Sequence, residues 1–288
     1  MISMDAEWGV GMRLDSVPKF PWNMSLGAIK NDLLIEKIGS EIGYQFKRLG
    51  IHMNFAPVID INTNPKNPII GNRSYGENKI NVSEKGISFT KGIQSNNVLA
   101  TAKHFPGHGD TSKDSHLTLP TINFDEKRIK KVELYPFKKL IEDGLSAVMI
   151  AHLNVPSLEK ENMLPSTLSK NIIEKTLIKE LNFNGLIITD ALEMKGVSEF
   201  TKKNVDLMAF LAGNDILLMS SDISKGIKSI KKSIKKGKIS EQRLARSVKK
   251  ILKAKYKVGL NSYKSIETTN LIDDLNSISV TNLINKSI

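Results

Sequence analysis

The segment GLIITD, residues 185–190, is a short apolar run that ends in a carboxylate. Five further runs of this kind occur along the chain, at residues 2–4, 52–61, 99–105, 147–153 and 215–220. Apolar runs without alternation are typical of parallel strands that are covered on both faces. Segments with helical periodicity lie between them, and such a strand–helix repeat indicates right-handed βαβ units. The sequence therefore predicts an α/β fold with one parallel sheet.

Several of these runs end in polar side chains, and this placement decides between two parallel-sheet architectures. The polar residues are Asp5, Glu7, Asp60, Lys103, His104, His152 and Asp190. In a (β/α)8 barrel the working residues come from the C-terminal ends of many strands, whereas a doubly wound sheet gathers them at one switch point, often beside a glycine-rich phosphate loop. No G-x-G-x-x-G follows a strand here. We therefore expect a (β/α)8 TIM-type barrel.

The expected strands and helices account for most of the elements of such a barrel. About six strands can be identified, whereas the fold has eight. Because the first strand begins at residue 2, we expect the chain to lack the N-terminal one or two strands of the barrel. Helices are expected at residues 33–49, 83–94, 125–142 and 170–181. Ser83 and Ser169 are candidate N-caps, and Pro136 is awkward for the third helix.

The chain is expected to divide near residue 260. Residues 1–260 are assigned to the barrel domain. Beyond Gly259 the sequence becomes rich in Asn, Ser and Thr, which is typical of a linker. We expect residues 261–288 to form this linker and to lead into a further C-terminal domain.

The net charge of +12 is concentrated in one region. Residues 225–257 contain twelve Lys, two Arg and one acidic residue, so the rest of the chain is nearly neutral. Apolar residues recur between these lysines at helical spacing, which indicates two amphipathic helices. The lysines form the solvent-exposed faces of these helices. A nucleic-acid surface would gain from aromatic stacking groups or an arginine stripe, and Tyr256 is the only aromatic residue there. We therefore expect no nucleic-acid partner.

Composition excludes several other classes. No stretch approaches the ~20 consecutive apolar residues of a membrane span, and the charge at Asp5 argues against a signal peptide at residues 1–5. Cysteine is absent, which excludes disulfides, thiolate zinc sites and a cysteine nucleophile. Both the cytoplasm and the periplasm are compatible with this sequence.

Asp190 has two interpretations from its own segment. At the end of a barrel strand, a carboxylate is placed for catalysis. The residues that follow, ALEMKGV, are expected to begin a helix. Asp190 could equally be the N-cap of that helix, with Glu193 completing a capping box.

A second candidate region is KHFPGHGDTSKDSH, residues 103–116, which holds three of the five histidines. His104, His108, Asp110, Asp114 and His116 are all plausible metal ligands. Their spacing matches no compact zinc motif, and Lys103 would repel a cation, so we expect no metal and no other cofactor. The alternative is acid/base chemistry, in which Asp114 orients His116 if the loop curls and raises its pKa toward the working range.

Two arginines lie in glycine-rich loops that follow strands. Only six of the 42 basic residues are Arg, so the chain strongly favours Lys. Arg13 in DAEWGVGMRL and Arg73 in GNRSYG are exceptions to this preference. Such an arginine suits bidentate recognition of oxygen atoms. It could equally form an ion pair that fixes its loop.

Together these motifs resemble those of glycoside hydrolase family 3. The histidine loop, GLIITDALEMKGV, DAEWGVGMRL, NFAPVIDI and NRSYG carry the resemblance, which runs through nearly the whole chain. The histidine loop is similar to that of the bacterial β-N-acetylglucosaminidase branch, which includes the peptidoglycan-recycling enzyme, rather than to that of the β-glucosidases. The resemblance implies a barrel with further sequence before the strand that ends at Asp5.

The resemblance also implies roles for individual residues. Asp190 corresponds to the nucleophile, and His116 with Asp114 to the acid/base dyad. A second set corresponds to positions that hold the hydroxyls and the N-acetyl group of the sugar: Asp5, Arg13, Arg73, Lys103 and His104.

The implied activity is retaining hydrolysis of terminal, non-reducing, β-linked N-acetylglucosamine, with N-acetylglucosamine-containing saccharides such as peptidoglycan fragments as substrates. A histidine acid/base would equally admit phosphate as the attacking group. The alternatives are therefore a phosphorolytic N-acetylglucosaminidase of the same fold, or an incomplete barrel without turnover.

Overall fold

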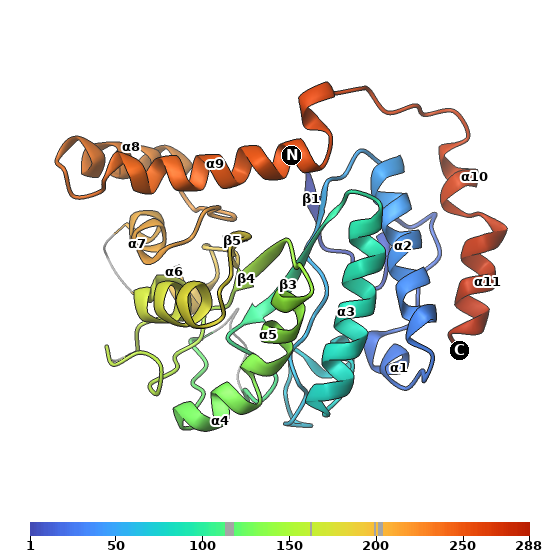
Figure 1. The fold of residues 1–288 in the computed structure, drawn as a ribbon, viewed down its shortest axis with the longest axis horizontal. Helices are drawn as coiled ribbons and strands as arrows, with labels where there is room; N and C mark the ends of the chain where they lie inside the picture. Colours follow the sequence, from blue (N-terminus) through green and yellow to red (C-terminus); the bar gives the residue numbers. More distant parts are fainter. Residues whose placement is uncertain (113–117, 162, 199, 201–203) are drawn as a thin grey trace.

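In the computed structural model, five parallel strands form one sheet in the order β1-β2-β3-β4-β5 (Figure 1). The strands are β1 (Ser3–Met4), β2 (Met53–Asn54), β3 (Leu99–Phe105), β4 (Ala147–Ile150) and β5 (Leu186–Thr189). The structure describes residues 1–112, 118–161, 163–198, 200 and 204–288. The expected α/β barrel fold is confirmed, as a curled sheet that makes up part of a barrel.

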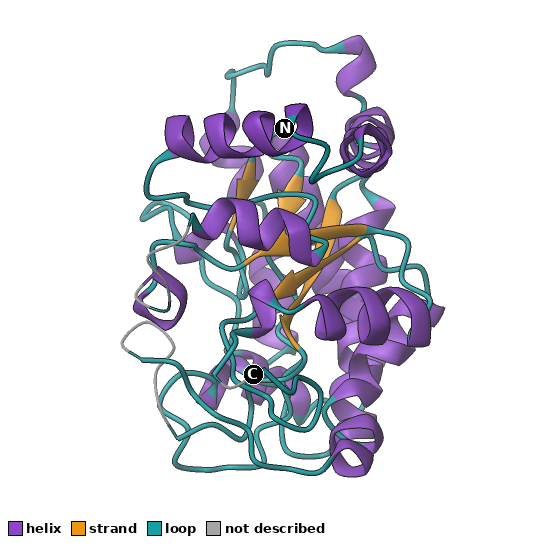
Figure 2. Ribbon diagram, turned by 90° about the vertical axis from the view of Figure 1, so that its left-hand side faces the viewer, coloured by secondary structure: helices purple, strands orange, loops and turns teal. Residues whose placement is uncertain are grey.

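Helices lie around this sheet, as Figure 2 shows. They are α1 (Asn23–Gly27), α2 (Asp32–Arg48), α3 (Lys79–Ser95), α4 (Glu126–Lys131), α5 (Leu134–Glu142), α6 (Lys195–Ser198), α7 (Val205–Ala212), α8 (Ile223–Lys235), α9 (Glu241–Lys257), α10 (Leu271–Leu275) and α11 (Ile278–Lys286). The segment η4 (Asn171–Glu180) is wound as a π-helix. Short 3-10 turns occur at Val10–Met12, Gly71–Arg73, Ser166–Leu168 and Leu260–Ser262.

Both faces of the strands are buried, which explains their continuous apolar sequence. Along β4, Val148 and Ile150 pack in the cluster shared with α2, α3 and α5, whereas Ala147 and Met149 pack in the cluster shared with α9. This alternation follows from the two-residue repeat of a strand. One face of the sheet therefore meets α2, α3 and α5, and the other faces the barrel interior, where side chains of α9 also pack.

Most of the expected strands are shorter than the sequence indicated, and two of them differ most. Residues 52–61 contain only Met53–Asn54 as a strand, followed by a bridge from Val58 to Lys103, because Pro57 has no amide hydrogen for the ladder. Residues 215–220 form only an isolated bridge between Ile216 and Ile188. There, Leu218 donates its amide hydrogen to the Thr189 hydroxyl, 2.9 Å away, instead of a backbone carbonyl.

Helix boundaries also correct the sequence expectations. Helix α3 begins earlier than Ser83 and is capped by Asn78, while Ser83 bonds back to the Lys79 carbonyl. The expected helix 125–142 is two helices, and Pro136 lies in the first turn of α5, where a missing amide hydrogen costs nothing. Ser169 does accept the Ile172 amide hydrogen, at 3.0 Å, so its cap is confirmed.

The last residues lie against α2, far from α9 (Figure 1). Leu275 and Val280 are buried in the main core, and Arg48 pairs with Asp274 at 2.7 Å. The assignment of residues 261–288 as a linker toward a further domain stays a prediction.

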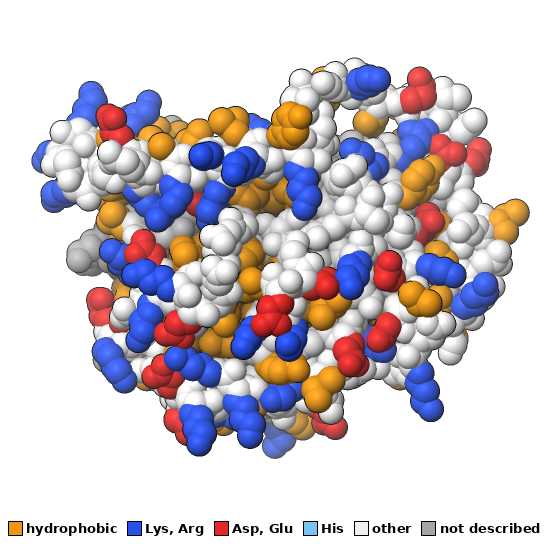
Figure 3. Space-filling model, viewed as in Figure 1, with side chains coloured by type: hydrophobic (Ala, Val, Ile, Leu, Met, Phe, Trp, Pro, Cys, Tyr) orange, Lys and Arg blue, Asp and Glu red, His pale blue; other side chains and the backbone are white. Residues whose placement is uncertain are grey.

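The basic segment forms α8 and α9, with lysines and exposed apolar side chains between them along the upper edge of Figure 3. Ile227 and Leu252 are exposed. Among the residues that the structure describes, no helix is both long enough and apolar enough to cross a bilayer.

Candidate active site

A cavity of about 450 Å³ opens where the strands end at their C-termini. Its walls come from the segments after β1 and β2, from the end of β3, from the segment after β5 and from residues 218–219. The lining residues are Asp5, Glu7, Trp8, Met12, Arg13, Ile69, Arg73, Lys103, His104, His108, Met149, Asp190, Ala191, Glu193, Met194, Leu218 and Met219. The cavity thus combines charged groups on some walls with an aromatic ring and thioethers on others, a combination that suits an amphipathic ligand such as a sugar.

A buried ion-pair network holds one wall together. Glu7 is 2 % exposed, and both of its oxygens accept from Arg73, at 2.8 and 2.9 Å. Lys103 lies 2.8 Å from Glu7 and 2.7 Å from Asp5. Burial alone would raise the pKa of Glu7, but Lys103 and Arg73 outweigh it and hold that pKa far below its ordinary value. Burial would likewise lower the pKa of Lys103, yet Glu7 and Asp5 raise it.

Arg13 joins this network at the cavity mouth. It lies 3.3 Å from the Asp5 carboxylate and donates to the Asp5 carbonyl at 3.2 Å. Its side chain is 48 % exposed, so Arg13 keeps donors that a ligand can use.

His104 is oriented from both sides of its ring. Its Nδ1 lies 2.6 Å from the Asp60 carboxylate, which is fully buried, and its Nε2 lies 3.3 Å from Arg73 Nη2. Because a guanidinium can only donate, Nε2 accepts from Arg73 and Nδ1 carries the hydrogen that Asp60 accepts. Burial alone would raise the pKa of Asp60, but its interactions with His104 and with the His108 amide hydrogen keep it below the ordinary value.

His108 shapes the histidine loop from within. Its ring is buried, with Nδ1 2.7 Å from the Thr111 hydroxyl, and its carbonyl accepts from Asn67 at 2.8 Å. Asp110 bonds to Thr63 at 3.0 Å. Burial, supplemented by the nearby His104, lowers the pKa of His108 to about 4.

This pKa predicts a pH-dependent stability. Between the folded pKa of about 4 and the ordinary value of 6.5, the unfolded chain binds a proton that the folded chain does not. Stability is therefore expected to fall by up to about 3 kcal/mol from this residue as the pH falls through that window. Urea unfolding of wild type and His108→Asn at several pH values measures it. Equal slopes for the two proteins would contradict the expectation.

Asp190 lies at the end of β5, half-buried in the cavity wall. One of its oxygens accepts the Ala191 amide hydrogen at 2.8 Å. Burial would raise the pKa of this carboxyl, but its interactions with His152 and His104 and the Ala191 hydrogen bond hold it below the ordinary value. Asp190 is therefore an ionised carboxylate that faces a cavity.

The alternative role of Asp190 as a helix cap is wrong. The first helix after it is α6, which begins at Lys195, and among the described residues its side chain accepts the amide hydrogen of the adjacent Ala191 instead of one in the first turn of that helix. Residues 191–194 do not begin a helix as the sequence suggested, because Leu192 donates its amide hydrogen sideways to the Leu218 carbonyl at 2.9 Å.

Six of the eight residues singled out from the sequence line this one cavity: Asp5, Arg13, Arg73, Lys103, His104 and Asp190. The other two, Asp114 and His116, lie outside the described residues.

Sequence reasoning did not assign a site role to Glu7, Asp60 or His152. Each was visible as a polar residue at the end of an apolar run, which was the available signal. Their pairings with Arg73, with His104 and with the segment after β5 join residues 39 to 66 positions apart in the chain. The spacing of residues along the sequence does not predict such pairings.

The described part of the chain offers no metal cluster. Over residues 1–112, 118–161, 163–198, 200 and 204–288, no three His, Asp or Glu side chains are arranged to hold an ion. In addition, the two ring nitrogens of His104 are already engaged by Asp60 and by the positively charged Arg73.

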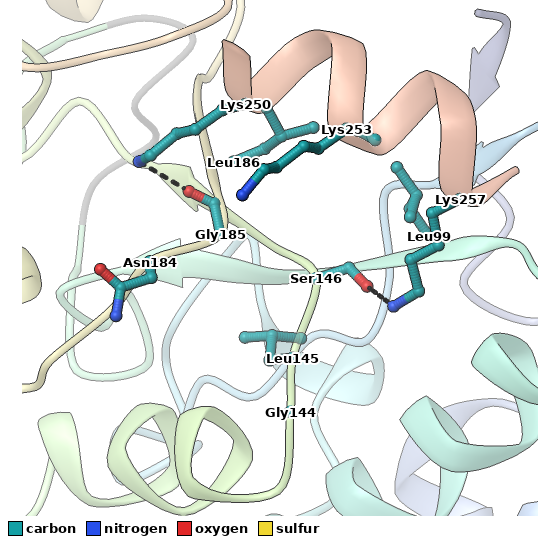
Figure 4. Close-up of a pocket in the computed structure, with 11 residues that line it drawn as sticks. Leu99, Gly144, Leu145, Ser146, Asn184, Gly185, Leu186, Lys250, Lys253 and Lys257 are labelled. Carbon is teal, nitrogen blue, oxygen red and sulfur yellow. Dashed lines mark hydrogen bonds between the residues drawn. The ribbon is translucent and has the colours of Figure 1, made fainter. Parts of the chain in front are cut away.

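A second, smaller pocket of about 220 Å³ lies at the opposite end of the strands, under α9 (Figure 4). Lys250 donates to the Gly185 carbonyl at 2.9 Å and lies 3.1 Å from Asp215. Lys257 donates to the Ser146 hydroxyl at 3.1 Å. These lysines fasten α9 across the N-terminal ends of the strands, which is where barrels carry stabilising contacts instead of catalytic ones.

Known proteins share this fold and much of this sequence. Beta-hexosaminidase A of Pseudoalteromonas piscicida is 35 % identical over an alignment of 286 residues. The match covers 91 % of this chain and 48 % of that protein. A family 3 β-N-acetylglucosaminidase from Paenibacillus sp. str. FPU-7 matches with a TM-score of 0.93 at 39 % identity, over 100 % of this chain and 55 % of that one. A beta-glucoside phosphorylase matches with a TM-score of 0.93 at 25 % identity, over 99 % and 54 %.

The chain spans about half the length of curated relatives that it matches. Its residues 1–254 match the family model described as the glycosyl hydrolase family 3 N terminal domain. The barrel strands, the cavity at their C-terminal ends and this match agree with one another, and the chain belongs to glycosyl hydrolase family 3.

Proposed function

We propose that this chain carries the catalytic barrel of a retaining exo-β-N-acetylhexosaminidase, which removes terminal, non-reducing, β-linked N-acetylglucosamine. The observation that carries the proposal is the ionised Asp190, which lines the same cavity as the Asp5–Lys103–Glu7–Arg73 network. The names of the relatives, a beta-hexosaminidase and a β-N-acetylglucosaminidase, support the choice of sugar.

The proposed reaction proceeds in two displacements at the anomeric carbon. The Asp190 carboxylate attacks that carbon, the glycosidic bond breaks, and His116 gives its proton to the leaving oxygen. His116, now neutral and oriented by Asp114, then takes a proton from water, which attacks the same carbon and releases Asp190. A histidine with an ordinary pKa near 6.5 can perform both transfers at neutral pH.

Five residues are proposed to hold the sugar: Asp5, Arg13, Arg73, Lys103 and His104. The charges of Lys103 and Arg73 are fixed by Glu7, so their remaining hydrogens can point at sugar hydroxyls with little cost in ordering. Arg13 at the cavity mouth is proposed to bind an N-acetyl carbonyl or an acidic aglycone such as a muramic acid unit. We therefore propose peptidoglycan fragments as the natural substrates.

The proposal is tested with 4-nitrophenyl N-acetyl-β-glucosaminide and with 4-nitrophenyl β-glucoside. Release of nitrophenol is expected from the first and not from the second. Turnover no faster than that of the Asp190→Ala variant would support an incomplete barrel instead. Unchanged turnover after dialysis against a chelator is expected, and a loss restored by added zinc would favour the metal alternative at the histidine loop.

The acid/base assignment predicts a dependence on the leaving group. His116→Ala is expected to lower kcat about 10²–10⁴-fold for a methyl aglycone, which must be protonated to leave. The loss is expected to be much smaller for 4-nitrophenol, which leaves without protonation. Ser115→Ala, one residue away in the same loop, is the matched control and is expected to keep its activity. Equal losses for both aglycones would contradict the assignment.

Phosphorolysis is the second candidate, favoured by the similarity to a beta-glucoside phosphorylase. With inorganic phosphate in place of water as the second nucleophile, the product would be N-acetylglucosamine 1-phosphate. Analysis of the products formed in phosphate buffer by ³¹P NMR separates the two reactions.

A further inference from the structure

His152 is a fully buried histidine that the proposed mechanism does not use. It follows β4, next to the segment that carries Asp190. Ile150 pairs with Thr189 in the sheet, and the Asp190 amide hydrogen bonds to the Ile150 carbonyl at 2.9 Å. The His152 ring reaches the residue after Asp190, with Nε2 2.9 Å from the Ala191 carbonyl.

The hydrogen bonds around His152 reveal its protonation state. Nδ1 lies 2.6 Å from the Thr167 hydroxyl, and that hydroxyl lies 2.7 Å from the Ala151 carbonyl. Carbonyl oxygens only accept. Nε2 must therefore carry a hydrogen for Ala191, and the Thr167 hydroxyl must give its single hydrogen to Ala151.

Nδ1 then meets the Thr167 oxygen with no hydroxyl hydrogen between them, so Nδ1 must carry a hydrogen of its own. The three contacts need three hydrogens, whereas a neutral histidine and one threonine supply two. With the neutral ring, one buried contact below 3 Å would join two lone pairs, which is unfavourable. Only the doubly protonated ring satisfies all three contacts.

We propose that His152 is a permanent imidazolium, fixed by Thr167 and Ala191, which acts as a positioning charge for the carboxylate of Asp190. The consequence for catalysis rests on the proposed function. When water releases the sugar, the bond from Asp190 to the anomeric carbon breaks and its electron pair returns to the carboxylate. A fixed positive charge nearby stabilises that returning charge and keeps the resting carboxylate ionised.

Ring-¹⁵N-histidine labelling tests the charge directly, without reference to activity. The chain has five histidines, and the His152 signals are identified by their loss in His152→Gln. At about pH 8, well above the ordinary pKa of ~6.5, long-range ¹H–¹⁵N spectra of the wild-type protein are expected to show two protonated ring nitrogens for His152. One protonated and one bare nitrogen would overturn the proposal.

The pH profile of kcat/KM gives the functional readout. Among the residues that the structure describes, the other ionisable groups that interact with Asp190 are Lys103, His104, His108 and Arg73, and a substitution at His152 leaves all four in place. His152→Gln is expected to move the acid limb upward by about one pH unit or more, because the carboxylate loses a neighbouring positive charge. Thr167→Val, which removes the acceptor for Nδ1, is expected to move it in the same direction.

His52→Gln is the matched control, because His52 lies at the start of β2, at the other end of the sheet from the cavity. An unmoved acid limb in both His152→Gln and Thr167→Val would overturn the positioning role. A neutral ring in a fully active enzyme would refute the imidazolium and leave the proposed function intact. A charged ring in a chain without turnover would support the imidazolium and contradict the proposed function.

Discussion

Asp190→Ala is expected to lower kcat for 4-nitrophenyl N-acetyl-β-glucosaminide by at least about 10³-fold. The carboxylate is proposed to form the covalent bond to the sugar, and alanine has no nucleophile to take its place. Binding is expected to survive, because the ion-pair network of Asp5, Lys103, Glu7 and Arg73 in the same cavity is unchanged. The measurement is steady-state kinetics together with a binding titration of N-acetylglucosamine.

Azide then distinguishes a nucleophile from an acid/base residue. If Asp190 is the nucleophile, azide replaces it in a single displacement and gives the α-glycosyl azide. If it were the acid/base residue, azide would attack the covalent intermediate and give the β-anomer. Product NMR reads the anomer directly.

Glu193→Ala provides the matched control, since Glu193 is a second carboxylate that lines the same cavity. It is expected to keep most of its activity and to form no glycosyl azide. A comparable loss in both variants would remove Asp190 from the nucleophile role.

Glu7→Gln is expected to lower the free energy of unfolding by about 3–5 kcal/mol, because it leaves the buried Lys103 and the half-buried Arg73 as charges without their shared partner. Lys103 is 2 % exposed, and Asp5 alone would remain beside it. The folded pKa of Glu7 lies below its unfolded value. Its contribution is therefore fully present above about pH 4.5 and is lost as the pH falls toward the folded pKa. Urea denaturation at pH 7 measures the full effect.

Two further variants make this result specific. Glu126→Gln removes an exposed carboxylate that pairs with Lys130 at 2.7 Å, and it is expected to change stability little. Glu7→Gln combined with Lys103→Met is expected to be more stable than Glu7→Gln alone, because one uncompensated charge is gone. A double variant less stable than the single one would show that hydrogen bonding, and not charge, dominates the network.

Local sequence patterns predicted most of the secondary structure and the position of the site. Strand β3 has the bounds that its apolar run indicated, and α2 differs by one residue at each end. The errors arose where a side chain or a proline replaced a backbone hydrogen bond, as at Thr189 and Pro57. Periodicity reports burial and does not report whether a ladder continues.

The candidate site was predictable in part. Polar residues at strand ends indicated that Asp5, Lys103, His104 and Asp190 lie at one edge of the sheet, because parallel strands bring their C-terminal ends together. The same rule placed Glu7, Asp60 and His152 at that edge, but it could not say which carboxylate would pair with which cation. The roles of Asp114 and His116 stay predictions, which rest on their spacing in the histidine loop and on the resemblance.

The sequence by itself determined the parallel α/β barrel fold and the loops that carry the charged groups, since both follow from patterns a few residues long. Only the tertiary structure decided the partners: Glu7 with Arg73 across 66 residues, Lys103 with Asp5 across 98, and Asp60 with His104 across 44. It also decided which groups carry protons. The ionisation of Asp190 and the second ring hydrogen of His152 both depend on neighbouring buried groups. Coulombic and hydrogen-bond energies act over such distances in space, and no spacing along the chain encodes them.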